Sequence, residues 1–226
     1  MALFCVFING IRTKLLVFRE RIRYKFIKIG YCIFERKTDG RSKMENKDVI
    51  LENTKELVCN NGFDKVTVKM ICEKTNISRK TFYTFYQDKY DILEHILIKD
   101  IITELNDLID KFGKMELNRP IILEQMYQNI YDNKDFYSKV INTKGENSLE
   151  SYLLYYFIKC YYKILADVKV DNAVEMDYLT YFYSSSSVML IKKWILDGYV
   201  LTPKQIAEYY QNWAVSALAN NYFYCK

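Results

Sequence analysis

Apolar residues recur at helical spacing over most of this chain. They fall three and four positions apart over residues 92–108 and 122–130, and again over 148–165, 175–196 and 203–218. This spacing places apolar side chains along one face of a helix. The 226-residue chain has only two prolines and seven glycines, and no segment shows the strict alternation of a strand. The pattern therefore predicts an all-α fold with enough apolar content for a buried core.

Two short helices separated by a tight turn are predicted within residues 67–86. Thr67 is a suitable N-cap for the first helix. Asn76 follows that helix and tolerates the left-handed backbone that such turns often need. Ser78 then caps the second helix. This arrangement is typical of a helix-turn-helix, in which the second helix enters the major groove of DNA.

The second helix interleaves buried aromatic residues with a polar face. Phe82 and an aromatic residue three or four positions later are spaced to be buried. The residues left to face outward are Arg79, Lys80, Thr81, Tyr83 and Thr84. Lysine reaches guanine acceptors and threonine contacts base edges, so Lys80, Thr81 and Tyr83 are candidate base contacts. Aromatic residues at this spacing often serve only a core, but the order of cap, turn and polar face favours DNA binding.

The helix before this pair has apolar residues at positions 50, 57 and 58. It is expected to end at Asn60-Asn61-Gly62, a sequence typical of a helix C-cap. Phe63, the next residue, is expected to be buried. Together, residues 49–97 resemble the amino-terminal DNA-binding domain of the TetR/AcrR family of transcriptional regulators. The resemblance rests on Gly62-Phe63, Thr67-Val68, Asn76-Ile77-Ser78, Thr81-Phe82-Tyr83 and Lys89. The sequence departs from the family pattern at Asn53, Thr54 and Cys72, where alanine is usual, and at Asn76, where glycine is usual.

The resemblance implies contacts with double-stranded DNA. It implies phosphate contacts from Thr67, Tyr83 and Lys89, and base or near-base contacts from Lys80 and Thr81. It also implies a three-helix DNA-binding domain over residues 44–93 and a helical ligand-sensing and dimerisation domain over residues 94–226. The full predicted DNA-binding set is Thr67, Ser78, Arg79, Lys80, Thr81, Tyr83, Thr84 and Lys89.

The formal charge of +5 belongs to the beginning of the chain. Residues 1–43 hold eleven Lys and Arg against three acidic residues, whereas the remaining residues are slightly acidic. We interpret this basic N-terminal extension as the product of an upstream start, absent or disordered in the cell. A second interpretation is an arm that reaches DNA or lies on an anionic membrane.

Neither a membrane span nor a signal peptide is predicted for this extension. Its uncharged stretch, residues 1–11, is shorter than the roughly 20 apolar residues of a spanning helix. The charges follow the apolar stretch, unlike the order in a signal peptide. A cytoplasmic protein without a membrane partner is therefore expected.

The sequence offers no catalytic or metal site. The six cysteines form no C-x-x-C pair, and His95 is the only histidine, so a zinc site is not expected. The chain also lacks a glycine-rich phosphate loop and a nucleophile elbow. We predict no catalytic residue, no metal and no cofactor, and hence a protein that is not an enzyme.

The last two predicted helices, 175–196 and 203–218, are candidates for a homodimer interface. Two such helices from each chain could form a four-helix interface around a twofold axis. The candidate interface residues are Tyr181, Ser185, Val188, Ile206, Tyr210, Trp213 and Ala217. An ordinary core within one chain is the alternative. The pattern Lys193-Trp194-Ile195-x-x-Gly198 also resembles a TetR subgroup related to regulators of dihydroxyacetone kinase operons.

Tyrosines are concentrated between these ends of the chain. Tyr127, Tyr131, Tyr155 and Tyr156 are candidates to line an effector pocket. The alternatives are an AT-rich coding sequence, which raises tyrosine content without a pocket, and a partner protein that binds in place of a small molecule.

The expected function is that of a homodimeric regulator released from a palindromic operator by an effector or partner. Repression is expected because a bound dimer excludes polymerase, and activation is the alternative. A membrane-surface interaction protein anchored by residues 1–30 is the alternative.

Overall fold

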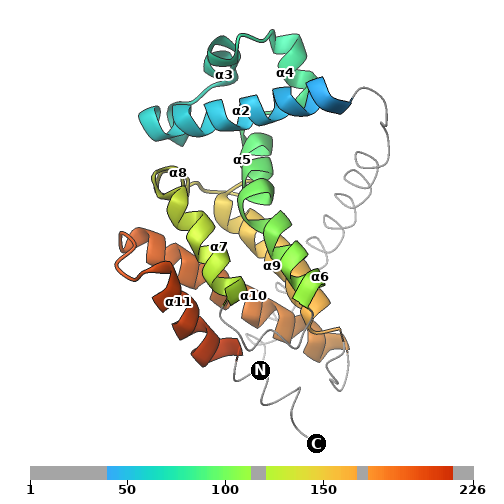
Figure 1. Ribbon diagram of the computed structural model, residues 1–226, viewed down its shortest axis with the longest axis vertical. Helices are drawn as coiled ribbons and strands as arrows, with labels where there is room; N and C mark the ends of the chain where they lie inside the picture. The colour runs from blue at the N-terminus through green and yellow to red at the C-terminus, as the bar shows by residue number, and fades with distance from the viewer. Residues whose placement is uncertain (1–39, 113–120, 167–172, 216–226) are drawn as a thin grey trace, which may run out of the picture. The chain divides into compact units, whose positions relative to one another are not determined.

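The computed structural model describes residues 40–112, 121–166 and 173–215 (Figure 1). The chain divides into two compact units, residues 1–46 and 47–226. Residues 1–39 of the predicted N-terminal extension lie outside the described residues. Within the described ranges every regular element is a helix, which confirms the all-α prediction.

The first group of helices contains the predicted helix-turn-helix. It comprises α2 (Gly40–Asn61), the 3₁₀ turn η1 (Phe63–Lys65), α3 (Val68–Thr75) and α4 (Arg79–Phe85). Its core includes Val58, Phe63 and Phe82, each at most 2% exposed. Tyr86, the residue after α4, is also buried. The predicted burial of Phe63 and Phe82 is confirmed.

A long helical segment leads from this group to the rest of the chain. It runs through α5 (Lys89–Leu97), the π-helical turn η2 (Ile98–Ile102) and α6 (Thr103–Phe112) without a break (Figure 1). The sequence predicted one amphipathic helix here but not its π-helical turn. The predicted domain boundary at residues 93/94 falls inside α5 and stays a prediction.

The remaining helices form a second bundle. It contains α7 (Ile121–Asp132), α8 (Lys134–Val140), α9 (Leu149–Ile164), α10 (Ala173–Leu196) and α11 (Pro203–Tyr210), which ends in the π-helical turn η4 (Gln211–Val215). α9 packs against α10, and α7 packs against α11. α10 ends at Leu196, and the chain turns at Gly198, whose φ of 74° is left-handed. None of the described helices is both long enough and apolar enough to cross a membrane.

Candidate nucleic-acid interface

Local side-chain caps fix both helices of the helix-turn-helix. The Thr67 hydroxyl accepts a hydrogen bond from the Met70 amide at 3.3 Å, and the Ser78 hydroxyl accepts one from the Thr81 amide at 3.0 Å. Asn76 ends α3 with φ 52° and ψ 39°, the left-handed conformation predicted from its position. Two caps and one left-handed residue thus set the ends of α3 and the start of α4.

The hydroxyl groups of α4 are held by neighbours in the same helix. The Thr81 hydroxyl lies 2.8 Å from that of Ser78, and the Thr84 hydroxyl donates to the Thr81 carbonyl at 2.6 Å. These bonds restrict the side-chain rotamers before any partner binds. A pre-set polar surface loses less conformational entropy on binding.

One face of α4 is exposed and cationic. Arg79, Lys80 and Thr84 are exposed, and the Tyr83 side chain is 58% exposed. The ring of Tyr83 meets the buried ring of Phe82 edge-to-face, with 5.3 Å between centroids. The exposed side chains can donate hydrogen bonds to base edges and to phosphates.

Lys89 does not point outward with this group. Its Nζ donates to the backbone carbonyls of Phe63, Asp64 and Val66 at 2.9, 3.1 and 3.1 Å. Burial lowers the pKa of Lys89, and the carboxylates of Asp64 and Asp88 partly oppose that change. The phosphate contact implied by the resemblance would require this ammonium group to leave its carbonyl partners.

Two lysines beside Thr67 are not among the predicted DNA-binding residues. Lys65 and Lys69 are exposed next to the N-terminus of α3. Lys69 is only loosely paired with Glu73, at 3.7 Å, and both side chains are mostly exposed. The sequence signal for these two lysines is their position two residues before and two residues after the Thr67 cap. Cations beside a helix N-terminus that faces DNA suit phosphate contacts.

Comparison with known proteins assigns the family. Residues 50–96 match the bacterial regulatory proteins of the tetR family, and residues 119–214 match the C-terminal region of transcriptional regulators of the TetR type. The chain belongs to the TetR family. It is therefore a DNA-binding transcriptional regulator, and the resemblance inferred from the helix-turn-helix is confirmed.

The relatives of this TetR-family regulator include a dihydroxyacetone kinase operon activator. The chain is 24% identical over 130 residues to the dhaKLM operon transcriptional activator DhaS of Lactococcus lactis subsp. lactis (strain IL1403). This match spans 58% of the chain and 64% of the relative, less than two thirds of the relative's length.

Solved structures share the fold of this TetR-family regulator. A dihydroxyacetone kinase operon activator DhaS matches with a TM-score of 0.60 and 19% identity, covering 78% of this chain and 97% of that chain. A TetR-family regulator from Syntrophomonas wolfei str. Goettingen matches with a TM-score of 0.58 and 18% identity, covering 79% and 96%.

A buried polar junction links the DNA-binding helices of this TetR-family regulator to its second bundle. The Lys55 Nζ on α2 pairs with the Asp100 carboxylate on η2 at 2.8 Å and donates to the Asn133 side chain at 3.0 Å. The Tyr137 hydroxyl donates to the other Asp100 oxygen at 3.2 Å. Lys55 and Asp100 are only 12% and 7% exposed. Burial raises the pKa of Asp100, although the bond with Lys55 opposes the rise.

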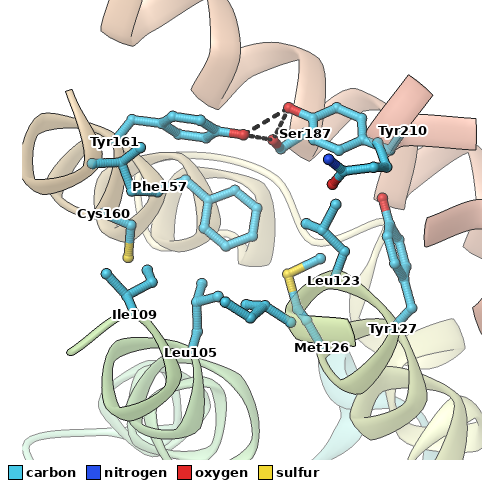
Figure 2. A pocket seen from close by; sticks show the side chains of 13 residues that line it. Leu105, Ile109, Leu123, Met126, Tyr127, Phe157, Cys160, Tyr161, Ser187 and Tyr210 are labelled. Carbon is cyan, nitrogen blue, oxygen red and sulfur yellow. Dashed lines mark hydrogen bonds between the residues drawn. The ribbon is translucent and has the colours of Figure 1, made fainter. Parts of the chain in front are cut away.

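A cavity of about 60 Å³ lies between α6 and the second bundle (Figure 2). Leu105, Ile109, Met126 and Phe157 supply apolar walls. At one end the hydroxyls of Tyr161, Ser187 and Tyr210 lie 2.6 to 3.1 Å apart. The Cys160 thiol also faces this space, and burial raises its pKa to about 11. The cavity is therefore apolar, with hydroxyl groups gathered at one end.

The structure brings only one of the four candidate effector residues to this cavity. Tyr127 lines it, whereas Tyr131 stacks on Trp194 with centroids 6.3 Å apart. Tyr155 and Tyr156 pack on each other, and the Tyr156 hydroxyl donates to Glu94 at 3.0 Å. In the structure these three tyrosines contact neighbours outside this cavity, and their assignment to an effector site stays a prediction.

The predicted dimer residues also lie in different environments, some exposed and some buried. Tyr181 and Trp213 are 50% and 66% exposed. Val188, Ile206 and Tyr210 are buried inside the single chain, where they have no surface to offer a partner. Their burial fits the alternative of an intrachain core, and the interface assignment stays a prediction. Ser185 is half-buried, and Ala217 lies outside the described residues.

Proposed function

We propose that this TetR-family regulator binds a palindromic operator as a homodimer and regulates a neighbouring promoter. The exposed polar face of α4, fixed by the Ser78 cap, carries the proposal. Two such helices in successive major grooves would be spaced about 34 to 36 Å apart. Lys80 and Thr81 are assigned to bases, and Thr67 and Tyr83 to phosphates.

An exposed apolar surface on α10 supports the homodimer. Tyr178, Tyr181, Phe182 and Met189 are between 46% and 64% exposed and follow helical spacing. Trp213 adds an exposed ring that stacks on Tyr209. Exposed apolar patches of this kind mark interfaces in soluble proteins. The buried area gained by pairing would stabilise a dimer by about 25 cal/mol per Å².

The cavity is the proposed effector site. Its volume of about 60 Å³ is far below the roughly 300 to 1,000 Å³ of pockets for drug-sized ligands. An effector of a few non-hydrogen atoms fits the cavity as it stands, and an aromatic effector requires the bundle to open. A partner protein acting on the same bundle is the alternative effector.

The sign of regulation is proposed as repression, because a dimer on a promoter blocks polymerase directly. The relative named as an activator of the dhaKLM operon makes activation the specific alternative. A promoter fusion with and without the regulator separates the two by the direction of the change in expression.

Footprinting of the full chain on DNA flanking its own gene tests DNA recognition. We expect a protected palindrome that is lost in Lys80→Ala. Lys204→Ala is the matched control, because Lys204 is an exposed lysine on α11. Equal protection by the wild-type protein and Lys80→Ala would show that α4 does not read the operator.

A further inference from the structure

Among the described residues, the hydroxyl of Tyr127 is buried without a hydrogen-bond partner. The side chain lines the cavity between α6 and the second bundle and is 0% exposed. Its ring meets that of Trp194 edge-to-face, with 5.3 Å between centroids. Burial raises the pKa of Tyr127, so the hydroxyl keeps its proton. Because buried hydroxyl groups are nearly always hydrogen-bonded, this donor calls for an acceptor inside the cavity.

Three more hydroxyl groups lie at the end of the cavity toward which the Tyr127 hydroxyl points (Figure 2). The oxygens of Tyr161, Ser187 and Tyr210 are 2.6 to 3.1 Å apart. The Ser187 hydroxyl donates to the Tyr183 carbonyl at 2.9 Å, and the Tyr161 and Tyr210 protons serve the bonds within the cluster. Each hydroxyl has one proton but two lone pairs. This hydroxyl cluster can therefore accept further hydrogen bonds but has no proton left to donate.

A single hydroxyl group on a ligand meets both requirements. It accepts from Tyr127 and donates to the hydroxyl cluster, whereas a carbonyl oxygen only accepts and an ammonium group only donates. The lining residues that the structure describes include no Asp, Glu, Lys, Arg or His. A charge buried without a partner is strongly disfavoured. This end of the cavity thus favours an uncharged ligand that carries a hydroxyl group.

The rest of the cavity limits the size of the ligand and the nature of its other end. The volume of about 60 Å³ is roughly four to six times the 10 to 15 Å³ that one water needs, and less than half of the roughly 150 Å³ of a cavity that binds benzene. About three or four non-hydrogen atoms therefore fit. The walls at this end are the apolar side chains of Leu105, Ile109, Met126 and Phe157. A second polar group on the ligand would be unsatisfied against them.

We propose that this cavity binds an uncharged short-chain alcohol with one hydroxyl group, which accepts a hydrogen bond from Tyr127 and donates one to the hydroxyl cluster. The alkyl chain of the alcohol lies against the apolar walls. This inference rests on the proposed effector role of the cavity and deepens it by naming the class of effector. Propan-1-ol, with four non-hydrogen atoms, is the probe.

Methyl NMR of the full chain with labelled methionine tests binding, because Met126 lines the cavity. Propan-1-ol should shift the Met126 methyl resonance saturably, with a Kd of about 0.1 to 10 mM, the range open to so small a ligand. Ethane-1,2-diol and the cation of propan-1-amine have the same number of non-hydrogen atoms and should bind at least about tenfold more weakly. A cavity that holds only water would give no saturable shift. That result, or equal binding of the diol or the amine, would overturn the proposal.

Tyr127→Phe isolates the proposed hydrogen bond. Because the hydroxyl has no partner among the described residues, its removal should not lower the urea midpoint of unfolding. It should weaken propan-1-ol binding about five- to tenfold and leave binding of 1-chloropropane, a ligand of the same size without a hydroxyl, unchanged. Tyr178→Phe, at an exposed position, is the control and should change neither. Equal losses for both ligands, or no loss for propan-1-ol, would overturn the assignment of Tyr127.

Operator affinity separates this inference from the proposed function. Footprinting without alcohol tests operator binding alone, and saturating propan-1-ol should then change operator affinity at least about fivefold. An operator bound with the same affinity with and without propan-1-ol would overturn the effector class. A chain in which propan-1-ol shifts Met126 but which protects no operator would refute the proposed function and retain the alcohol site.

Discussion

The junction between α2 and η2 allows an asymmetric prediction about stability. Lys55 and Asp100 form an ion pair at 2.8 Å in which both side chains are nearly buried. The short Asp100 side chain cannot reach water, whereas the long Lys55 stem can carry its ammonium group to the surface when it loses its partner. We therefore expect Lys55→Met to destabilise the protein more than Asp100→Asn does.

The size of the stability loss in Lys55→Met follows from the burial of the Asp100 carboxylate. Removing one partner of a buried ion pair costs about 3 kcal/mol at the lower end of the usual range. For a chain of this size, that corresponds to a fall of roughly 6 to 12 °C in unfolding midpoint. Asp100→Asn removes the buried charge itself and keeps one acceptor oxygen for Lys55, while its amide NH2 can donate to the Tyr137 hydroxyl, so we expect a loss of under about 1 kcal/mol.

The pH dependence has a definite sign. Burial raises the pKa of Asp100 in the folded state, so its contribution to stability is fully present below the unfolded pKa and is lost as pH rises through the folded pKa. Losing Lys55 raises that pKa further. The deficit of Lys55→Met should thus be largest near pH 7 and shrink on acidification toward about pH 4.

Urea unfolding of both variants at fixed protein concentration and at several pH values tests this asymmetry. Lys69→Met is the control, because the pair of Lys69 with Glu73 is exposed and 3.7 Å long and contributes little. A loss in Asp100→Asn equal to or larger than that in Lys55→Met would refute the reasoning. So would a deficit of Lys55→Met that does not change with pH.

Three further predictions address the dimer, the histidine and the hydroxyl cluster. Trp213→Ser should weaken self-association at least tenfold, or about 1.4 kcal/mol, as measured by sedimentation equilibrium. Ile121→Ser removes an exposed apolar side chain on α7 and is the control, which should leave self-association unchanged. Burial alone would lower the pKa of His95, but hydrogen bonds to Asp91 raise it overall. The stabilisation from protonated His95 is therefore present below its unfolded pKa and lost as pH rises. His95→Gln should lower the free energy of unfolding more at pH 6 than at pH 8.5. Tyr210→Phe removes a hydroxyl that lies 2.6 Å from the Ser187 hydroxyl and 2.8 Å from the Tyr161 hydroxyl. This change should lower the free energy of unfolding by about 1 to 2 kcal/mol. Tyr178→Phe, at an exposed position, should leave it unchanged.

Features decided by neighbouring residues were predictable from sequence. The caps at Thr67 and Ser78 and the left-handed Asn76 depend on a few consecutive residues, and the structure has all three. Family membership followed from the same short segment. These elements need no knowledge of which helices later pack together.

Features decided by tertiary packing were not predictable in the same way. Helical spacing shows that Ile206 and Tyr210 share an apolar face, but it does not show whether that face meets α7 or a second chain. In the structure α11 packs on α7, so both residues are buried. The direction of Lys89 depends likewise on where η1 lies, 23 or more positions away in sequence. Spacing identifies a face, and the partner of that face is a property of the whole fold.

Helix α7 provides a physical link between the cavity and the DNA-binding helices. Its Met126 and Tyr127 line the cavity, and its Asn129 side chain donates to the Asp100 carbonyl at 2.9 Å. Asn133, the residue after α7, accepts from Lys55 at 3.0 Å. The α-helical rise places Tyr127 and Asn129 only about 3 Å apart along the axis. A shift of α7 by about 1 Å would stretch the Asn129 bond beyond hydrogen-bond range.

On the proposed function, an effector that enlarges the cavity must move α7 and therefore strain this junction. Effector and operator binding are typically coupled by about 1 to 3 kcal/mol, which the loss of the neutral Asn129 bond together with the charge-assisted Lys55–Asn133 bond supplies. If the junction carries the coupling, Asn129→Ala should leave operator affinity nearly unchanged without effector and reduce the change in affinity that the effector causes. Full coupling in Asn129→Ala would show that the signal leaves the cavity by another route, such as the buried contact between Glu94 on α5 and Tyr156 on α9.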